Sequence, residues 1–345
     1  MLEFAKRKGY AKILDPRIDF ALNSIEVEYR RDPLTGESGR IAHMGIVAAQ
    51  KIDYSVWDKP EHHEMCPFCP GNIERSTPRF PAELIPEGHI KKGGARVIAN
   101  IAPYDRYSAL TVMGPEHVMP LEKMSAAYLK DAFEAGLEFC RTVLEKEREL
   151  PYSIIAWNYM PPSGGGLLHP HQQLIITDEP GNLYRKVMRE SKNYRQKWGE
   201  NFWEELCRRE EEAGERFIGR IEEGYWLTAF CPQGVLGEIM AVFPGRSTIY
   251  DLDEKIIDGL VKGLLCLFKY FDSKNICSFN LALFAAPAGE GEKDFSLHIR
   301  VIPRFYMNLL LYTPDMSSMQ VALQEPFSVV NPEEQCREIA PFFKS

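Results

Sequence analysis

Apolar residues recur along the chain at two spacings, one typical of helices and one typical of strands. Over residues 122–150 they stand at helical intervals, which predicts a long amphipathic helix, and residues 253–271 repeat this pattern. Short apolar runs bounded by Gly and Pro predict strands between and around these helices. We expect strands in the segments 95–104, 107–117, 152–162, 171–177, 225–232, 237–246, 277–287 and 295–305.

The order strand–strand–helix–strand–strand therefore occurs twice. Short turns between consecutive strands favour antiparallel sheets, so we expect an α+β fold built by tandem duplication, with one long helix per unit. The N-terminal half is expected at 1–190, and a degenerate C-terminal half at 191–345 begins with a helical connection at 191–223. Four residue pairs share a separation of 129 residues: Pro103 and Pro232, Pro115 and Pro244, His117 and Arg246, and His169 and His298. At the same separation Arg300 falls opposite His171, so we expect the second half to have lost this histidine.

Composition narrows the class of protein. The 345 residues include 41 Lys and Arg against 49 Asp and Glu, a net charge of -8, without a basic block. This balance argues against a protein that coats nucleic acid, but it admits small phosphorylated ligands. The N-terminus has no secretion signal and no run is long enough to span a membrane. Eight cysteines without a secretion signal indicate reduced thiols and a cytoplasmic location.

The sequence CPFC places Cys66 and Cys69 on one tight turn, a spacing that tetrahedral zinc accepts. Two unpaired thiols, or a redox pair, are the alternative interpretations. His117 and His169, each beside a turn, are the candidates for a third and a fourth ligand. A closed Cys2His2 site of this kind would be structural and would tie the N-terminal loop to the sheet. The rival histidines at 62–63 lie in a charged run that is typical of solvated surface.

The sequence HPHQQ places three polar side chains at alternate positions, His169, His171 and Gln173. Alternate residues of a strand point to one face of a sheet, so these three are expected to lie together. A lone histidine there would be an ordinary polar residue, but a glycine-rich turn before the strand favours a phosphate site. In such a site His171 could attack phosphorus while Gln173 donates a hydrogen bond to a non-bridging oxygen. The turn comprises Ser163, Gly164, Gly165 and Gly166.

HPHQQ, with CPFC upstream, GPEH between them and RRDPLTGE near the start, resembles the galactose-1-phosphate uridylyltransferase branch of the histidine triad superfamily. That branch also contains ADP-glucose phosphorylase and, more distantly, the diadenosine tetraphosphate phosphorylases. The likeness runs from about residue 26 to 340, because these enzymes are also tandem duplications, and it implies half-barrel sheets. HPHQQ matches the family motif H-P-H-x-Q without a gap.

The resemblance implies a ping-pong nucleotidyltransferase. His171 would attack a nucleotide sugar such as a UDP-hexose and become nucleotidylated, Gln173 would stabilise the transition state, and a hexose 1-phosphate would accept the UMP group. It also implies structural zinc on the two cysteines and two histidines named above, and it admits a homodimer, since these enzymes often pair. Substrate or nucleotide binding is assigned to Arg30, Asn100, Asn158, Ser163, Gly164, Gly165, Gly166, Arg300, Gln324 and Glu325.

Departures from the family leave the substrate open. Gly166 stands where the uridylyltransferases have a serine, and Ser163 is the substitute available here. Phe284, His298 and Arg300 stand where some members bind a second metal, so that site is expected to be absent. One alternative is a phosphorylase or hydrolase of ADP-glucose or dinucleoside polyphosphates, in which phosphate or water is the acceptor. Another is a zinc-stabilised nucleotide-binding protein without catalysis, because the degenerate second half shows that the architecture tolerates the loss of active residues.

Overall fold

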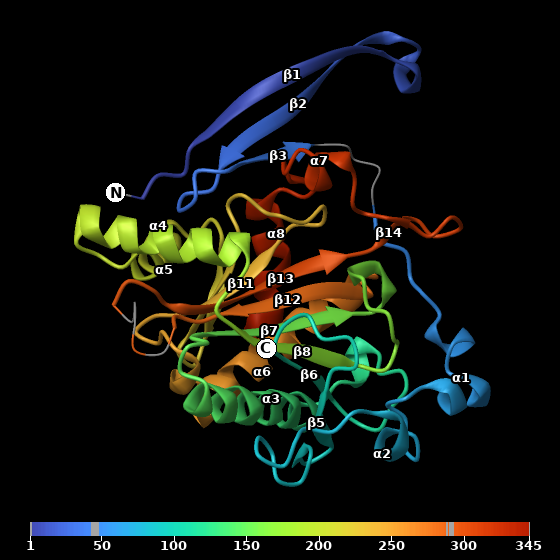
Figure 1. The fold of residues 1–345 in the computed structure, drawn as a ribbon. Helices are drawn as coiled ribbons and strands as arrows, with labels where there is room; N and C mark the ends of the chain where they lie inside the picture. Colours follow the sequence, from blue (N-terminus) through green and yellow to red (C-terminus); the bar gives the residue numbers. More distant parts are fainter. Residues whose placement is uncertain (1, 43–47, 288, 290–292, 345) are drawn as a thin grey trace.

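A ten-stranded antiparallel sheet forms the centre of the computed structural model, which describes residues 2–42, 48–287, 289 and 293–344. The sheet comprises β4 (Ile90–Lys92), β5 (Ala95–Ala99), β6 (Tyr107–Val112), β7 (Tyr152–Tyr159), β8 (His171–Thr177), β9 (Phe217–Ile221), β10 (Gly224–Thr228), β11 (Ile239–Phe243), β12 (Ser278–Phe284) and β13 (Leu297–Arg304). Their order is β4-β5-β6-β8-β7-β12-β13-β11-β10-β9, and Figure 1 labels the strands from β5 to β11 of this order.

This order reads as two similar halves that meet at β7 and β12. On each side the third strand out from the centre belongs to a strand pair that precedes a long helix, as the duplication predicts. β7 and β12 pair antiparallel from Ile155 opposite Leu283 to Tyr159 opposite Phe279. The expected α+β fold with antiparallel sheets is therefore confirmed, and the two half-sheets join edge to edge in one open surface.

The two predicted long helices, α3 (Ala126–Lys146) and α6 (Glu254–Ser273), pack against one face of this sheet (Figure 1). Each begins at a residue whose side chain accepts a backbone N–H of the first turn, Ser125 in α3 and Asp253 in α6. Their apolar faces form one continuous core with the sheet. No helix in the described segments has the length and apolar content needed to cross a bilayer.

The opposite face is covered by different elements in the two halves. In the first half it is covered by the CPFC turn between α1 (Pro60–Met65) and α2 (Ile73–Ser76), which packs on β5 and β6. In the second half it is covered by α4 (Asn182–Trp198) and α5 (Phe202–Ala213).

The predicted helical connection at 191–223 is only partly correct. The helical region begins earlier, at Asn182, and it ends at Gly214, which has a left-handed backbone conformation. Phe217–Ile221 is strand β9 rather than helix, because it turns back at Glu222 to pair with β10. The proposed boundary at residue 190 falls within α4 and remains a prediction.

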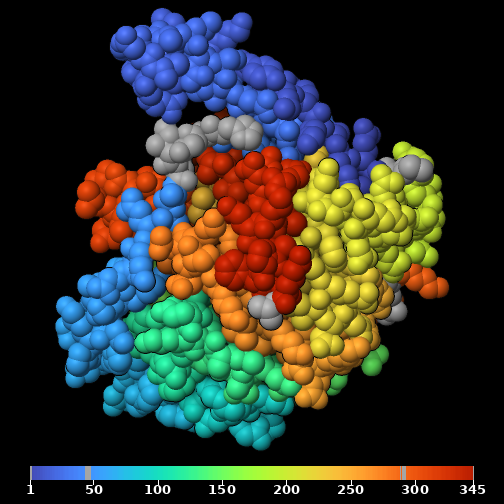
Figure 2. Space-filling view, turned by 180° about the vertical axis from the view of Figure 1, so that it is seen from behind, coloured from blue at the N-terminus to red at the C-terminus, as the bar shows by residue number. Residues whose placement is uncertain are grey.

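A second, four-stranded sheet comprises β1 (Lys6–Asp15), β2 (Ala21–Arg31) and β3 (Ser38–Ala42) from the N-terminal residues and β16 (Phe327–Ser328) from near the C-terminus. A turn that contains Pro33 and Gly36 joins β2 to β3. β1 and β2 continue beyond this sheet as a two-stranded arm that stands clear of the body (Figures 1 and 2). The remaining elements are β14 (Tyr306–Asn308), β15 (Thr313–Pro314), α7 (Ser318–Val321), α8 (Pro332–Ile339) and short 3-10 helices. Exposed apolar side chains of the arm are Tyr10, Ile13, Leu14, Ile18, Phe20 and Leu22.

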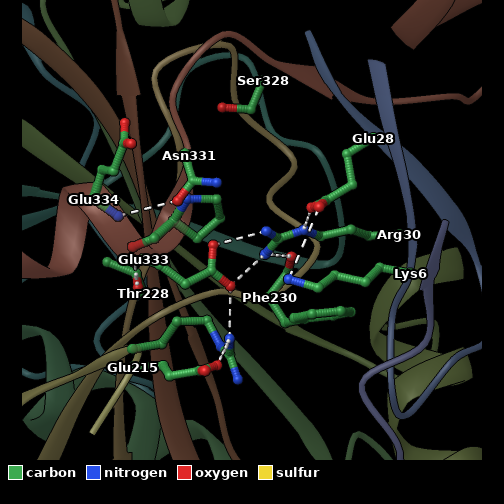
Figure 3. A network of polar contacts seen from close by, with 12 residues as sticks. Lys6, Glu28, Arg30, Glu215, Thr228, Phe230, Ser328, Asn331, Glu333 and Glu334 are labelled. Atoms are coloured by element: carbon green, nitrogen blue, oxygen red, sulfur yellow. Dashed lines mark hydrogen bonds and ion pairs between the residues drawn. The ribbon is translucent and has the colours of Figure 1, made fainter. Parts of the chain in front are cut away.

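A buried ion cluster holds the base of the arm against the body (Figure 3). Arg30 in β2 is fully buried and donates to Glu28, to the carbonyl of Phe230 and, through both terminal nitrogens, to the Glu333 carboxylate at 2.9 and 2.7 Å. The buried Arg216 donates to the same carboxylate at 2.6 Å. Glu333 in α8 therefore bridges two guanidinium groups from separate segments of the chain.

Glu333→Gln is expected to destabilise the protein by about 3 kcal/mol, because it leaves two buried guanidinium groups short of charge. Burial alone would raise the pKa of Glu333, but the hydrogen bonds and charge of Arg30, followed by Arg216, lower it from 4.5 to about 2. This lowered pKa stabilises the fold fully above about pH 4.5, and the stabilisation is lost as the pH falls toward 2.

Urea unfolding of wild type and variant, measured from about pH 7 to pH 3, should therefore show a stability difference that shrinks below about pH 4.5. Glu334→Gln on the exposed side of α8 is the matched control and should unfold like wild type. A constant difference across this pH range would contradict the assignment.

Candidate functional site

Four metal-ligating side chains from three segments meet in one buried cluster. Cys66 and Cys69 lie in the turn after α1, His117 follows β6, and His169 precedes β8. Their ligand atoms all lie within 4.8 Å of one another. The Nδ1 atom of His117 is 3.4 Å from the Cys69 Sγ, and the Nδ1 atom of His169 is 3.8 and 3.7 Å from the two sulfurs. The predicted Cys2His2 set is therefore brought together.

The donor set fits a tetrahedral metal. Zinc with ordinary ligand distances separates a sulfur and a nitrogen ligand by about 3.5 Å, close to the spacings in this cluster. The Nε2 atom of His169 donates to the carbonyl of Gly114 at 2.8 Å, which leaves Nδ1 unprotonated and directed at the sulfurs. Burial lowers the pKa of His169 to about 4, so its imidazole is neutral. Burial and the neighbouring Cys66 raise the pKa of Cys69 to about 12. A bound cation would lower this pKa again, because it stabilises the thiolate.

His171 lies two residues beyond this cluster, at the start of β8. Its Nδ1 donates to the backbone carbonyl of His169 at 2.9 Å, so Nε2 carries the lone pair, and no residue that the structure describes forms a hydrogen bond with it. Burial lowers the pKa of His171, which favours the neutral imidazole, while 9% of its surface remains exposed. A neutral histidine with one nitrogen anchored and the other free is suited to nucleophilic attack. Gln173, half-buried, follows on the same face of the strand.

Phe68 connects the cysteine turn to His171, and sequence reasoning missed it. Its ring contacts the edge of the His169 ring at 5.9 Å and that of His171 at 5.4 Å, measured between ring centroids. Because Phe68 lies between Cys66 and Cys69, a metal that fixes the turn also fixes this ring against His171. The only sequence signal was its place inside CPFC.

The glycine turn begins where β7 ends. Met160 has a strained backbone with φ 67°, and the Ser163 hydroxyl donates to the carbonyls of Tyr159 and Met160. Gly164 adopts φ +87°, and an added Cβ there would meet no atom within 4 Å, so this part of the turn faces open space. Gly166 is similarly open. At Gly165 a Cβ would lie 3.0 Å from the carbonyl oxygen of Asn158, a tight contact that the backbone would have to move to relieve.

Asn158 stands one position beyond the paired residues Trp157 and Gln172, which places it beside His171 on the neighbouring strand. Its Oδ1 accepts from Asn280 Nδ2 at 2.7 Å, and Asn280 also donates to the carbonyl of Ser163. Arg304 donates to Asn280 and is held by Asp315. A chain of polar groups from the second half therefore braces the turn. No local motif marks Asn280, so sequence reasoning had no signal for it.

Other predicted binding residues lie elsewhere. Every nitrogen of the Arg30 guanidinium donates to a protein acceptor at the base of the arm (Figure 3). Glu325 accepts from Ser38 and Arg40 beside the same small sheet, and Gln324 precedes it with a left-handed backbone.

Asn100 is also apart from His171. It bonds Ser108 and Ala102 in the turn between β5 and β6. Because His171 is opposite Val112 at the other end of β6, Asn100 lies about 13 Å farther along the sheet.

In the structure the two halves do not align at the separation of 129 residues that the sequence suggested for His169 and His298. The Nδ1 atom of His298 donates to the carbonyl of Ser296 at 2.9 Å, which repeats the bond from His171 to His169. His298 is therefore the counterpart of His171, 127 residues later, and Arg300 is the counterpart of Gln173 rather than of His171. The short gaps between the aligned segments account for the difference.

His298 is fully buried by stacking on the ring of Trp203 at 3.8 Å and on that of Phe284 at 4.9 Å. Arg300 is paired with the buried Glu238. That this half binds no second metal remains a prediction.

Comparisons with known proteins agree on the fold. No family model matches the sequence. An uncharacterized protein of Archaeoglobus fulgidus is 29% identical over 286 residues, 83% of each chain. The ADP-glucose phosphorylase of Arabidopsis thaliana with bound ADP-glucose has a TM-score of 0.70 at 15% identity, over 91% of this chain and 98% of that chain. A uridylyltransferase structure has a TM-score of 0.63 at 19% identity, over 92% and 98%. The fold that the resemblance implied is confirmed.

Protein purified without chelator is expected to contain about one divalent metal ion per chain, measured by elemental mass spectrometry. Cys69→Ala should remove this metal and lower the melting temperature by more than about 5 °C, because the cysteine turn loses its anchor. Cys266→Ala, which removes a half-buried thiol of α6, should keep the metal. Less than about half an ion per wild-type chain would contradict the Cys2His2 site.

Proposed function

We propose that the protein is a nucleotidyltransferase that works through a covalent nucleotidyl-histidine at His171. The observation that carries this proposal is the bond from His171 Nδ1 to the His169 carbonyl, which leaves Nε2 as a free nucleophile in a buried, neutral ring. The open glycine turn beside Asn158 supports it, because backbone N–H groups there could bind a phosphate. Gln173 lies on the same face to stabilise charge on the transferring phosphoryl group.

The transfer proceeds in two steps, in which the nucleotidyl-histidine is formed and then consumed. In the first, the Nε2 lone pair of His171 bonds to the α-phosphorus of a nucleotide sugar. The bond from that phosphorus to the bridging oxygen breaks, and sugar 1-phosphate leaves with the electron pair. In the second, an oxygen of the acceptor attacks the same phosphorus, the nitrogen–phosphorus bond breaks, and His171 becomes neutral again. The acceptor decides the reaction class.

Two donor and acceptor pairs are supported to different degrees. Transfer of UMP between UDP-hexose and hexose 1-phosphate follows from the motif resemblance. Transfer of AMP from ADP-glucose to phosphate is favoured by the fold match to the ADP-glucose phosphorylase, with a TM-score of 0.70. A zinc-stabilised nucleotide-binding protein without catalysis is the remaining alternative, and the free Nε2 of His171 argues against it.

We propose zinc as the metal and a structural role for it, because the closed set of two thiols and two imidazoles leaves no open position. A cytoplasmic location is supported by the eight cysteines, all unpaired, since free thiols persist in reducing compartments.

We also propose that two copies pair through the arm. Each of its six large apolar side chains is 39–68% exposed, so together they offer about 600 Å² per copy. These side chains lie on both faces of the ribbon, and a contact that covered all of them on two copies would bury about 1,200 Å², the lower limit of specific interfaces. A two-stranded ribbon is also marginally stable when both its faces stay in water.

Incubation with ADP-glucose or UDP-glucose, followed by intact-mass measurement, tests the reaction. The expected result is addition of one AMP or one UMP group, which also identifies the donor. His171→Ala should remove the added mass, because it removes the attacking nitrogen, while His89→Gln, a half-buried histidine of the β4 edge, should be labelled like wild type. Equal labelling of His171→Ala would overturn the covalent mechanism, and binding of the nucleotide without labelling of wild type would favour the non-catalytic alternative.

Light scattering coupled to size-exclusion chromatography tests the pairing. Wild type is expected at twice the chain mass. The double variant Phe20→Asp, Leu22→Lys should run as a monomer, because it places charges in the apolar surface, and Lys12→Ser on the same arm should remain paired. A monomeric wild type at micromolar concentration would rule out the arm as a dimer contact.

A further inference from the structure

Three polar side chains form a row behind the strand that carries His171, on the face that α3 covers. Gln172 in β8 stands directly opposite Thr111 in β6 and Trp157 in β7. All three residues are 0% exposed. α3 crosses the row at Gly136, where an added Cβ would lie 3.2 Å from the Thr111 Oγ1. The helix therefore seals the row from solvent.

Four polar atoms of this row have no hydrogen-bond partner among the residues that the structure describes: Thr111 Oγ1, Gln172 Oε1, Gln172 Nε2 and Trp157 Nε1. Native proteins leave few buried polar atoms unpaired, because the desolvation cost is then not offset. These four atoms belong to three side chains that stand side by side on neighbouring strands, on the face of the sheet that α3 covers. Donors and acceptors are both present, as a water molecule requires, and a buried water makes about three hydrogen bonds.

The second half of the chain shows that the fold does not need this polarity. The counterpart of His171 is His298, and the residue after it, Ile299, stands opposite Ala241 and Leu283. These three form the equivalent row beneath α6, and all of them are apolar and buried. The same architecture therefore carries Thr–Gln–Trp behind the free histidine and Ala–Ile–Leu behind the stacked one. The polar row therefore occurs in the half whose histidine, His171, remains partly exposed.

We propose that Thr111, Gln172 and Trp157 enclose ordered water behind β8 and that this hydrogen-bonded row positions His171. Gln172 follows His171 in the chain, so bonds made by its side chain hold the same stretch of backbone from the opposite face of the sheet. Trp157 precedes Asn158, and Val112 after Thr111 pairs with His171. The row thus joins three strands at the level of the reacting nitrogen. The positioning role rests on the proposed function, because a misplacement of about 1 Å can slow a reaction about 100-fold.

Crystal structures of wild type and of Gln172→Leu test both parts without using activity. In wild type, ordered water is expected within hydrogen-bond distance of at least two of the four atoms. In Gln172→Leu, whose side chain has nearly the same size, the water should be lost and the His171 ring displaced. A dry row in wild type would overturn the water site, and an unmoved His171 in the variant would overturn the positioning role.

Single-turnover labelling of His171 at saturating donor provides the kinetic test. Gln172→Leu and Thr111→Val are each expected to lower the labelling rate at least about 10-fold, with the half-saturating donor concentration unchanged, because the nitrogen is misplaced while the donor contacts remain. Thr111→Ser keeps the hydroxyl and should restore the rate. Leu174→Met, on the same face of β8, is the packing control and should label like wild type.

The outcomes separate this inference from the proposed function. If no nucleotide donor labels wild type, the proposed function fails, and the crystal structures still decide the water and the position of His171. If wild type is labelled and Gln172→Leu is labelled equally fast, the positioning role fails alone. Should Gln172→Leu not fold, Thr111→Val, which removes one hydroxyl from the same row, takes its place in both experiments.

Discussion

The pairing of β7 with β12 is the constraint on which the rest of the architecture depends. It joins the two half-sheets edge to edge, so that one core lies beneath both α3 and α6. The same pairing brings Asn280 of the second half against Asn158 of the first, and through it Arg304 and Asp315 brace the glycine turn. Residues from both halves thus support a site whose proposed chemistry belongs to one of them.

The duplication also shows how a site is lost without loss of the fold. The Nδ1 atom of His298 donates to the carbonyl of Ser296, just as that of His171 donates to the carbonyl of His169. The local backbone of the two strands is therefore the same. What differs is the cover on the open face. The rings of Trp203 and Phe284 stack on His298, which is 0% exposed, whereas the ring of Phe68 meets that of His171 edge to face and leaves 9% of His171 exposed. Access to the ring, rather than the presence of a histidine, separates the two halves.

The main helices and strands and the two motifs of the site could be predicted from the sequence, because each depends on a pattern within a short stretch of residues. Helical periodicity located α3 and α6, and short apolar runs located the eight inner strands. The two-residue alternation of HPHQQ and the spacing of CPFC predicted side chains that the structure brings together.

The misses depend on tertiary contacts. The arm of β1 and β2 is too rich in charge to show an apolar alternation, and β9 is a strand only because β10 pairs with it. The sequence also does not show that Glu333, 303 residues later, meets the guanidinium of Arg30, so the ion cluster at the base of the arm was not predicted. A role for Arg30 in substrate binding remains a prediction.

The distance in sequence between Arg30 and Glu333 has a consequence for synthesis on the ribosome. The arm leaves the ribosome 303 residues before the carboxylate that anchors it. At about 5–20 residues per second, roughly 15–60 s separate the two. During that interval the guanidinium of Arg30 remains hydrated and the apolar side chains of the arm are free to meet other nascent chains, so the arm is secured only after α8 has been synthesised.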